Sequence, residues 1–557
     1  MIQSLQQQVK TRSLSLEDAL QTITNEEGIL NLDLVDAQLS SRFLKQLRGV
    51  QSLCVPLLHW QNCYYLGSPR SIDAEQLQII KHKLNADINL IAIDEISYRK
   101  WYRQQHINHK TIATAKLINP LTGEIDNEDI AELTQITVDQ TDNQIARVKA
   151  LIASAVRYRA SDIHLEPCSD GLRVRYRIDG ILRNIMNFPP AISRKVIVSI
   201  KVMSEMDIAD SRRPQDGRMG EKYMSMDQQE QGLDLRVSTL PCVSNVKGEA
   251  SEKIVMRLLR QQNSFDTIDD VGFTRRSIDI YKHWLSQPQG LIIFTGPTGS
   301  GKTSTLYTSL QAIAEESKNI TTVEDPVEYV LPGITQTQVN EAAGMTFAAG
   351  LRAILRQDPD IIMLGEIRDH ETAETAVRAA LTGHLVLTTL HTNDAAGAIP
   401  RLRDIGPDPG LISDALLGVV AQRLVRRVCP HCTESYKPTE ADLKVLGLRK
   451  ENANPSEWRK GKGCGQCFHS GYLGREALIE LLDVDDMIRQ IIHDGTMTQL
   501  NRYLNEIAYD SFRMAAIEKV THGITTIEEI KRVLPFSALN VKPLGNHSEG
   551  RPLAVVS

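Results

Sequence analysis

The sequence of 557 residues predicts an α/β fold, and three observations support this class. From about residue 286 onward, short apolar runs typical of buried strands alternate with segments whose apolar residues recur at helical spacing. Before that point, a helical pattern begins after Asn143. It is followed by an alternating run at 172–178 and an Asp179-Gly180 turn, which together predict a β-hairpin. The length also exceeds what one hydrophobic core usually supports, so we expect about three or four domains.

The predicted organisation places these patterns in separate domains joined by polar segments. Pro120, Gly123 and a cluster of acidic residues indicate a solvated linker. The polar end of the chain predicts a disordered tail. The predicted segments are a first domain at 1–115, a linker at 116–137, an α+β domain at 138–285, an α/β domain at 286–541 with a cysteine-containing insert at 425–475, and a tail at 542–557.

Bulk composition is that of an ordinary globular protein, with 41% hydrophobic and 24% charged residues. The formal net charge of -6 argues against a dedicated nucleic-acid binder, although a local basic patch stays possible. No apolar run reaches the roughly 18 to 20 residues that cross a bilayer, and the first residues do not have the pattern of a signal peptide. We therefore expect a cytoplasmic protein whose eight cysteines are reduced or bind metal.

A glycine-rich loop lies between a predicted buried strand at 290–295 and a predicted helix. The loop is a complete Walker A motif, in which we expect Lys302 to reach the β- and γ-phosphates and the Thr303 hydroxyl to bind Mg²⁺. A chance match to a glycine-rich turn is the alternative, but both flanking elements favour ATP binding, because a helix N-terminus and successive backbone N–H groups attract phosphates. The predicted ATP-binding residues are Gly296, Pro297, Thr298, Gly299, Ser300, Gly301, Lys302 and Thr303.

Two further apolar runs end in carboxylates, which a Walker A site needs to orient Mg²⁺ or the attacking water. Glu366 follows the predicted strand at 360–364 and is a variant of the Walker B carboxylate. Glu324 follows the run at 320–323, and we predict it to be the general base, with Asp325 and Glu328 supporting the metal or the base. A solvated turn is the alternative for this second acidic cluster.

A third apolar run, at 385–390, is flanked by His384 and His391. Histidines near strands are often satisfied core or surface groups, and this alternative stays open. If the strand neighbours the phosphate loop, His391 at its exit can hydrogen-bond the γ-phosphate.

The four cysteines of two Cys-x-x-Cys knuckles predict a metal site. Each knuckle places two thiolates on a tight turn, and four thiolates suit a tetrahedral structural Zn²⁺ with no open position for catalysis. A redox pair or a chance pattern is the alternative. The predicted zinc ligands are Cys429, Cys432, Cys464 and Cys467. The remaining cysteines have no such spacing.

Taken together, these motifs make the chain similar to the secretion ATPases of type II secretion and type IV pilus assembly. The resemblance rests on a Walker A motif at 296–303, an aspartate box at 320–328, a Walker B motif at 360–369 and a histidine box at 382–394. It extends over about residues 138 to 535. It implies a RecA-like P-loop core preceded by a PAS-like α+β domain and an adaptor-binding N-terminal domain, with a zinc-binding insert.

The same resemblance implies that arginines of the α+β domain complete the hydrolysis site, in cis or across a subunit boundary. Positive charge is needed there because the transition state spreads negative charge over the γ-phosphoryl oxygens. The candidates are Arg213, Arg218 and Arg236, each of which can also be an ordinary structural arginine. Arg257 also matches the family pattern near the nucleotide.

The implied function is a cytoplasmic, hexameric ATPase that drives assembly of pilins or pseudopilins. Its implied partners are an inner-membrane platform protein and a membrane-anchored adaptor, which would hold it at the inner membrane without direct nucleic-acid binding. The tetracysteine element favours an assembly motor over a retraction motor. A DNA-translocating or conjugation-type motor and a non-enzymatic nucleotide-binding scaffold are the alternatives, disfavoured by the 5% aromatic content, the negative charge and the retained carboxylates.

Overall fold

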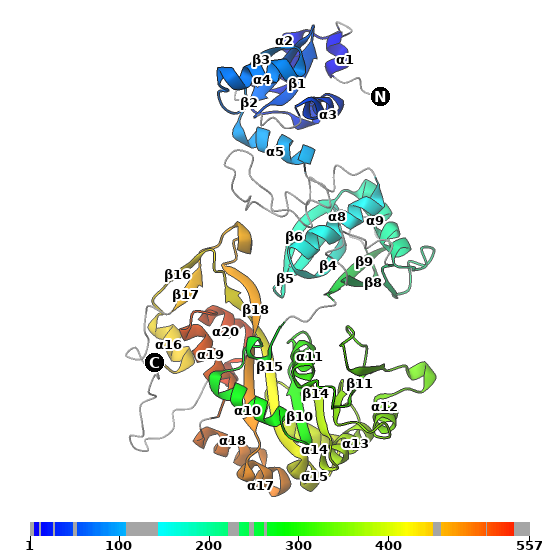
Figure 1. The fold of residues 1–557 in the computed structure, drawn as a ribbon, viewed down its shortest axis with the longest axis vertical. Helices are drawn as coiled ribbons and strands as arrows, with labels where there is room; N and C mark the ends of the chain where they lie inside the picture. Colours follow the sequence, from blue (N-terminus) through cyan, green and yellow to red (C-terminus); the bar gives the residue numbers. More distant parts are fainter. Residues whose placement is uncertain are drawn as a thin grey trace. The chain divides into compact units, whose positions relative to one another are not determined.

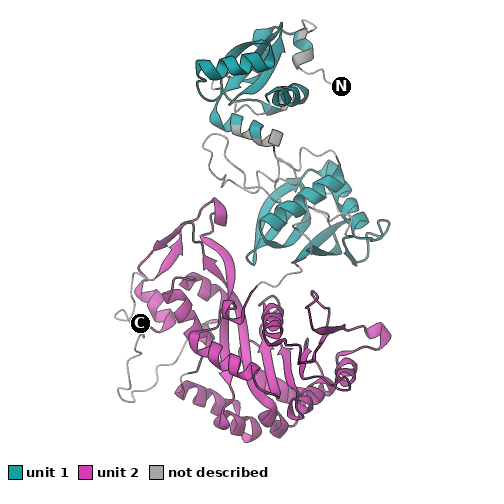
Figure 2. Cartoon of the chain, viewed as in Figure 1, with its two compact units in different colours: residues 1–259 teal, residues 260–557 magenta. Residues whose placement is uncertain are grey.

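The computed structural model describes residues 5–10, 13–25, 28–47, 53–106, 143–220, 233–243, 250–260, 265–448, 458–507 and 509–539. The chain forms two compact units, residues 1–259 and residues 260–557 (Figure 2). The predicted linker at 116–137 and the predicted tail at 542–557 lie outside the described residues. Among the helices that the structure describes, none is long and apolar enough to cross a membrane.

The N-terminal part of the first unit is a small three-stranded sheet with helices around it (Figure 1). Strand β2 pairs antiparallel with β1 and parallel with β3. Phe43, Leu66 and Trp101 lie in its buried core. The elements are α1 (Leu5–Lys10), α2 (Leu16–Ile23), the 3-10 helix η1 (Leu32–Leu34), α3 (Ala37–Gln46), β1 (Val55–Trp60), β2 (Cys63–Ser68), α4 (Ala74–Leu84), β3 (Asp87–Ala92) and α5 (Glu95–His106).

The second part of the first unit is a six-stranded sheet in the order β6-β5-β4-β9-β8-β7. The predicted hairpin is confirmed, since β5 and β6 pair antiparallel around Asp179 and Gly180, both at positive φ. Alternate residues of β5 are buried, and Tyr176 donates a hydrogen bond to the Leu151 carbonyl of α8. The elements are α8 (Gln144–Arg157), β4 (Ala160–Cys168), β5 (Gly171–Ile178), β6 (Ile181–Phe188), α9 (Pro190–Met203), β7 (Gln215–Arg218), β8 (Leu233–Val243) and β9 (Ala250–Arg260).

A seven-stranded sheet in the order β12-β11-β13-β14-β10-β15-β18 forms the core of the second unit (Figure 1). Its strand pairs are parallel except β15–β18. Both faces are covered, because Ile292 and Phe294 of β10 pack in one cluster with α10 and α11, whereas Leu291 and Ile293 pack in the other with α12 and α13. Every residue of β10 and β14 is buried, as expected for central parallel strands. The predicted α/β class is thus confirmed.

The elements of this sheet and its helices are the 3-10 helix η3 (Ile268–Asp270), α10 (Arg275–Leu285), β10 (Gly290–Thr295), α11 (Lys302–Ile313), β11 (Ile320–Glu324), β12 (Thr335–Gln338), η4 (Glu341–Ala343), α12 (Phe347–Ile354), β13 (Ile361–Leu364), α13 (His370–Leu381), β14 (Leu385–Leu390), α14 (Ala398–Ile405), α15 (Pro409–Ala415), β15 (Leu416–Val428) and β18 (Tyr472–Asp483). The remaining elements are β16 (Thr433–Ser435), α16 (Glu440–Leu446), β17 (Arg459–Gly461), η6 (Gly465–Cys467), α17 (Asp486–Asp494), α18 (Met497–Glu506), α19 (Phe512–Thr521), α20 (Ile527–Val533) and α21 (Phe536–Leu539).

Helix α10 packs against the parallel sheet, although the sequence prediction assigns it to the domain before residue 286. The Tyr281 ring lies edge-on to the Phe294 ring of β10 at 5.9 Å, and Trp284 donates a hydrogen bond of 2.8 Å to Asp483. The second compact unit therefore begins before the predicted boundary. The division of the chain into functional domains stays a prediction.

Candidate nucleotide-hydrolysis site

The Walker A loop connects the central strand β10 to helix α11. Gly296, Gly299 and Gly301 all have positive φ, which favours glycine. A Cβ atom at Gly296 would come within 2.4 Å of the Gln422 carbonyl oxygen, so a larger residue there would displace the loop. The loop ends directly at the N-terminus of α11, where unpaired N–H groups and the helix dipole attract anions. The local geometry is therefore that of a phosphate-binding loop.

Lys302 lies across this loop. Its Nζ atom donates hydrogen bonds to the carbonyl oxygens of Gly296 at 2.8 Å and Pro297 at 3.3 Å. Partial burial lowers the pKa of Lys302, and the nearby Glu366 carboxylate offsets only part of this shift. Thr303, in the first turn of α11, is exposed. A lysine and a free hydroxyl at the mouth of this loop fit a triphosphate and its Mg²⁺.

Glu366 lies just after β13, in contact with a residue of the histidine box and with an arginine of its own motif. Its Oε2 atom is 3.3 Å from Nε2 of His391, and its Oε1 atom forms an ion pair with Arg368. Arg368 also lies 3.9 Å from the Asp325 carboxylate, and its hydrogen bond to Glu366 raises the pKa of the guanidinium. Because β13, β14 and β10 are parallel neighbours, the residues after them meet at one edge of the sheet. The structure thus brings together Lys302, Glu366 and His391.

Glu324 ends β11, on the far side of β13 from the Walker A strand. Glu324 is 4% exposed. Its carboxylate accepts hydrogen bonds from Thr322 at 2.5 Å, from Gln336 at 3.0 Å and from the Tyr307 hydroxyl. Tyr307 also accepts a hydrogen bond of 3.3 Å from the backbone N–H of Glu328. The aspartate box therefore divides: Asp325 faces Arg368, whereas Glu324 is enclosed by protein donors.

His384 has a structural environment. Its Nδ1 atom lies 2.9 Å from the Ala379 carbonyl oxygen in the last turn of α13. The His391 side chain, in contrast, is 58% exposed and lies beside Glu366. The two histidines that flank β14 therefore differ in their surroundings, and His391 is the one at the candidate site.

The three candidate arginines belong to the first compact unit. Arg218 of β7 and Arg236 of β8 are directly opposite each other in an antiparallel pair, and both contact Asp234, at 2.6 Å and 3.6 Å. The Arg213 side chain is 85% exposed and lies 3.7 Å from Asp210. Arg257 pairs with Asp162 at 3.1 Å. Arg218 and Arg236 thus form one basic pair, and their role in hydrolysis stays a prediction.

The four cysteines of the two knuckles converge. Their Sγ atoms all lie within 4.8 Å of one another, with separations of 3.9 Å for Cys429–Cys464, 3.8 Å for Cys432–Cys467 and 3.7 Å for Cys464–Cys467. Tetrahedral thiolates about 2.3 Å from a zinc ion lie about 3.8 Å apart. The sulfur set therefore fits a tetrahedral metal centre compatible with zinc.

Backbone donors favour the thiolate form within this cluster. The N–H groups of Cys464 and Gly471 lie 3.2 Å and 3.3 Å from Sγ of Cys467. Burial raises the pKa of Cys467, but these hydrogen bonds outweigh it and bring the pKa to about 7. Burial raises the pKa of Cys429 to about 12. The Cys467 thiol thus gives up its proton more readily than the Cys429 thiol.

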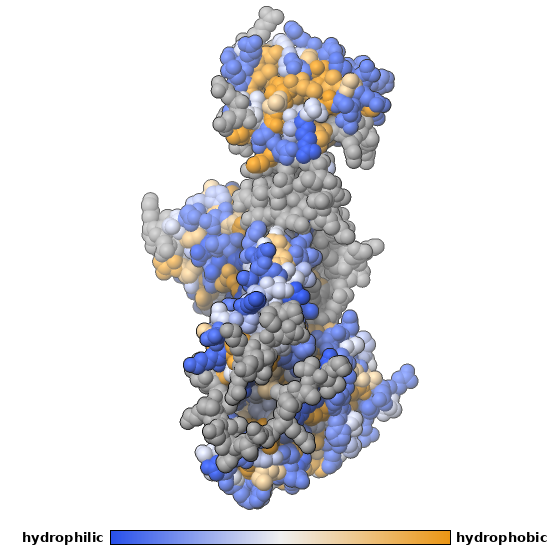
Figure 3. Space-filling model, turned by 90° about the vertical axis from the view of Figure 1, so that its left-hand side faces the viewer, coloured by the Kyte–Doolittle hydropathy of each residue, from blue (hydrophilic) through white to orange (hydrophobic). Residues whose placement is uncertain are grey.

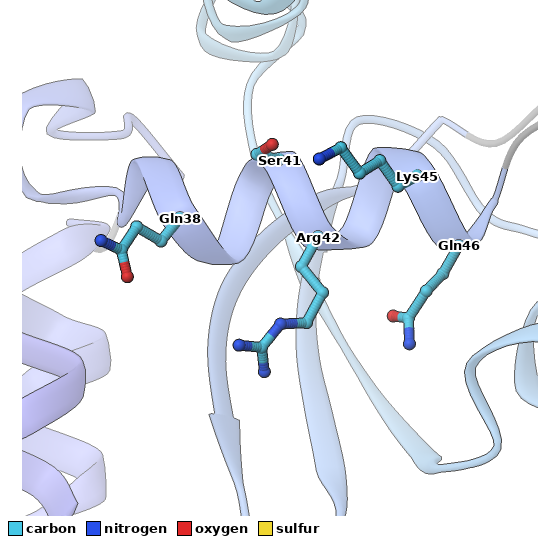
Figure 4. A pocket seen from close by; sticks show the side chains of 5 residues that line it. All are labelled: Gln38, Ser41, Arg42, Lys45 and Gln46. Carbon is cyan, nitrogen blue, oxygen red and sulfur yellow. The ribbon is translucent and has the colours of Figure 1, made fainter.

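A concave surface elsewhere lies along α3 in the N-terminal part (Figure 4). Ser41 and Lys45 point to one side of the helix, and Gln38, Arg42 and Gln46 point to the other. All five residues come from a single helix, and none is a predicted site residue, so this surface has no assigned role.

The fold and the edge of the sheet define the class of protein: an α/β P-loop ATPase with a tetracysteine element. Residues 138–532 match the family model described as Type II/IV secretion system protein. The chain is 44% identical to type II secretion system protein E of Pseudomonas aeruginosa over 87% of this chain and 94% of that relative. It is 40% identical to the type II secretion system ATPase E of Vibrio cholerae, over 84% and 91%.

The chain is also 43% identical to the type IV pilus assembly ATPase PilB of Thermus thermophilus, over 79% of this chain but half of that relative. Among solved structures, the ATPase DotB of Legionella pneumophila shares the fold, with a TM-score of 0.52 and 22% identity over 69% of this chain and 94% of DotB. The chain therefore belongs to the type II/IV secretion system protein family, and it is an ATP-hydrolysing enzyme of that family.

Tyr307, Gln336 and Arg368 are functional candidates that sequence reasoning did not assign. Arg368 lies within the Walker B run, two residues after Glu366, so its position was a usable signal. Tyr307 and Gln336 are 29 residues apart and meet only through the fold. For Tyr307, the available signal was its place four residues after Thr303, on the same face of the predicted helix.

Proposed function

We propose that this chain is the motor ATPase of a type II secretion or type IV pilus assembly system. In this role it forms a homohexamer in the cytoplasm at the inner membrane and hydrolyses ATP to drive assembly of pilins or pseudopilins. The observation that carries the proposal is that Lys302, Glu366 and His391 lie together at one sheet edge. The chain is also 44% identical to a type II secretion system protein E over 87% of its length.

Each predicted group has a role in this proposal. The Walker A backbone and Lys302 hold the triphosphate, and Thr303 binds Mg²⁺. Glu366 orients the attacking water or takes its proton, and His391 holds Glu366 in place. Arg213, Arg218 and Arg236 neutralise charge that develops on the γ-phosphoryl group. The cysteine cluster holds a structural Zn²⁺.

The division of labour among domains follows the predicted boundaries. Residues 1–115 bind a membrane-anchored adaptor, 138–285 supply the arginines, and 286–541 bind ATP and contact the platform protein. Exposed apolar side chains support a docking role for the first domain: Ile29, Ile79, Leu90 and Ile96 are 48%, 45%, 37% and 63% exposed. Figure 3 shows a patch of apolar residues in the middle of the face of this part that is turned to the viewer. Clustered exposed apolar residues mark interaction sites.

The test combines activity with partner capture. The full-length chain and a Lys302→Ala variant are assayed for Mg²⁺-dependent ATP hydrolysis in the presence of phospholipid vesicles or of DNA. In a second experiment, the tagged chain is recovered from native membranes and the proteins that co-purify with it are identified. The proposal expects hydrolysis that Lys302→Ala abolishes, capture of an inner-membrane platform protein and an adaptor, and a hexamer in solution scattering with nucleotide. DNA-stimulated hydrolysis without capture of membrane proteins would reject it in favour of a DNA-translocating motor.

A further inference from the structure

The Glu324 carboxylate lies in a buried hydrogen-bond cluster that a general base would not need. Oε1 accepts hydrogen bonds from Thr322 and from Gln336, and Oε2 accepts one from Tyr307. A carboxylate offers about four acceptor positions, so three of them are occupied by protein groups. A general base must instead reach a water molecule beside the substrate. Glu324 is only 4% exposed, so its surroundings are those of a buried structural carboxylate that accepts hydrogen bonds from the protein.

Tyr307 connects Glu324 to α11, the helix that follows the Walker A loop. It lies one turn after Thr303 on the same side of α11, because residues four apart in a helix are neighbours. Its hydroxyl donates to Glu324 and accepts from the Glu328 N–H and from Gln336, each at 3.3 Å. The fully buried ring packs edge-on against Tyr329 at 4.7 Å. Tyr307 therefore connects the aspartate box, residues 320–328, to the helix that begins at the Walker A loop.

Fixing Glu324 also fixes the residue that follows it. The Arg368 guanidinium lies 3.9 Å from the Asp325 carboxylate and also forms an ion pair with Glu366. The path from the Walker A helix to Glu366 thus runs through Tyr307, Glu324, Asp325 and Arg368. Displacing the aspartate box would therefore change how Arg368 holds Glu366.

We propose that Tyr307 and Glu324 are positioning residues, which hold Asp325 and Arg368 so that Glu366 is oriented for hydrolysis. Glu324 acts through the hydrogen bonds that it accepts, not by taking a proton from water. This inference rests on the proposed role of Glu366, and it replaces the sequence prediction of Glu324 as the base.

A substitution that keeps the acceptor separates the two roles. In Glu324→Gln, the amide oxygen can still accept from Tyr307, whereas the amide nitrogen replaces the Oε1 acceptor beside Thr322 and Gln336. The side chain can no longer act as a base. Tyr307→Phe removes the hydroxyl and keeps the ring. Tyr281→Phe is the matched control, since Tyr281 is also fully buried and its hydroxyl forms a hydrogen bond of 2.6 Å with Ser309, which lies outside the aspartate box.

The experiment measures kcat and KM for Mg-ATP across pH in the full-length chain, together with Kd for ATP. We expect Glu324→Gln to keep kcat within about fivefold of the wild type, with the acidic limb of the kcat/KM profile unchanged. We expect Tyr307→Phe to lower kcat about tenfold, with KM within about threefold, and Tyr281→Phe to change kcat less than about twofold.

Two results would overturn the inference. One is a kcat loss of about a hundredfold or more in Glu324→Gln together with loss of the acidic limb, which is the signature of a base. The other is a Tyr307→Phe variant that matches Tyr281→Phe. A Glu366→Gln variant measured in the same experiment tests the proposed role of Glu366 separately. Full activity of this variant would refute that role, whatever the Tyr307 and Glu324 variants show.

Discussion

Nε2 of His391 lies 3.3 Å from Oε2 of Glu366, although the two residues are 25 positions apart in the sequence and follow different strands. The parallel pairing of β13 with β14 produces this contact, because it places the ends of both strands at the same edge. The contact gives His391 a defined partner within the protein, the carboxylate that we propose to act on water.

Replacing His391 by alanine is expected to lower kcat about tenfold, because Glu366 loses the polar contact at 3.3 Å that orients it, while the Kd for ATP stays within about threefold. Steady-state kinetics with a parallel binding titration measures both quantities. His384→Ala is the control, since His384 contacts the Ala379 carbonyl and flanks the same strand. Equal effects of the two substitutions would contradict the assigned role.

Replacing Arg218 by alanine is expected to reduce kcat by about a hundredfold or more with little change in ATP affinity, because the positive charge matters most in the transition state. The Arg218 side chain is 69% exposed and pairs with Asp234. Arg378→Ala is a matched control, since Arg378 is 63% exposed and pairs with Glu374. Activity of Arg218→Ala at the level of this control would show that Arg218 is structural.

The cysteine cluster is expected to bind one zinc ion per chain, with tetrahedral thiolate coordination in X-ray absorption spectra. Cys429→Ser should lose the metal and lower the temperature of unfolding, because the ion joins the two knuckles. Cys242→Ser, at a cysteine outside the cluster, should retain it. Zinc content that is the same in Cys429→Ser and the wild type would rule out the assigned ligand set.

Acid should destabilise the first unit through Glu166. Burial raises the pKa of this carboxyl, but hydrogen bonds from Arg175, Lys253 and Arg173 outweigh it and lower the pKa to about 2. A depressed pKa contributes stability above the unfolded value near 4.5, and this contribution is lost as the pH falls toward about 2. The contribution is about 2 kcal/mol after allowance for the partial exposure of Arg173.

Denaturant unfolding of the wild type and Glu166→Gln at several pH values measures this contribution. We expect Glu166→Gln to be less stable at pH 7 and the difference to shrink below about pH 4.5. A difference in free energy of unfolding that is independent of pH would contradict the assignment.

Motifs that are local in the chain could be predicted from the sequence. The Walker A loop and the two cysteine knuckles each place their reactive groups within a few residues, so the spacing alone fixes the chemistry of Lys302 and of Cys429 with Cys432. The hairpin at β5 and β6 was predictable for the same reason, since alternation and the Asp179-Gly180 turn are adjacent. In each case the determining interactions are short-range.

Relationships that depend on sheet order could be predicted only conditionally. His391 was expected at the site if its strand neighboured the phosphate loop, and β14 does lie beside β10. The surroundings of Glu324 were not predictable, because a carboxylate after a strand looks the same in sequence whether it faces water or a buried tyrosine. Tyr307 meets Glu324 only because β11 and α11 are brought together by long-range packing.

Glu366, held between His391 and Arg368, is the carboxylate that we propose for ATP hydrolysis. The most direct test is single-turnover hydrolysis of Mg-ATP by full-length Glu366→Gln, with ATP binding measured on the same sample. We expect a hydrolysis rate lower by about a hundredfold or more, because the amide cannot take a proton, and a Kd for ATP within about threefold of the wild type. Hydrolysis within a few-fold of the wild-type rate would contradict it.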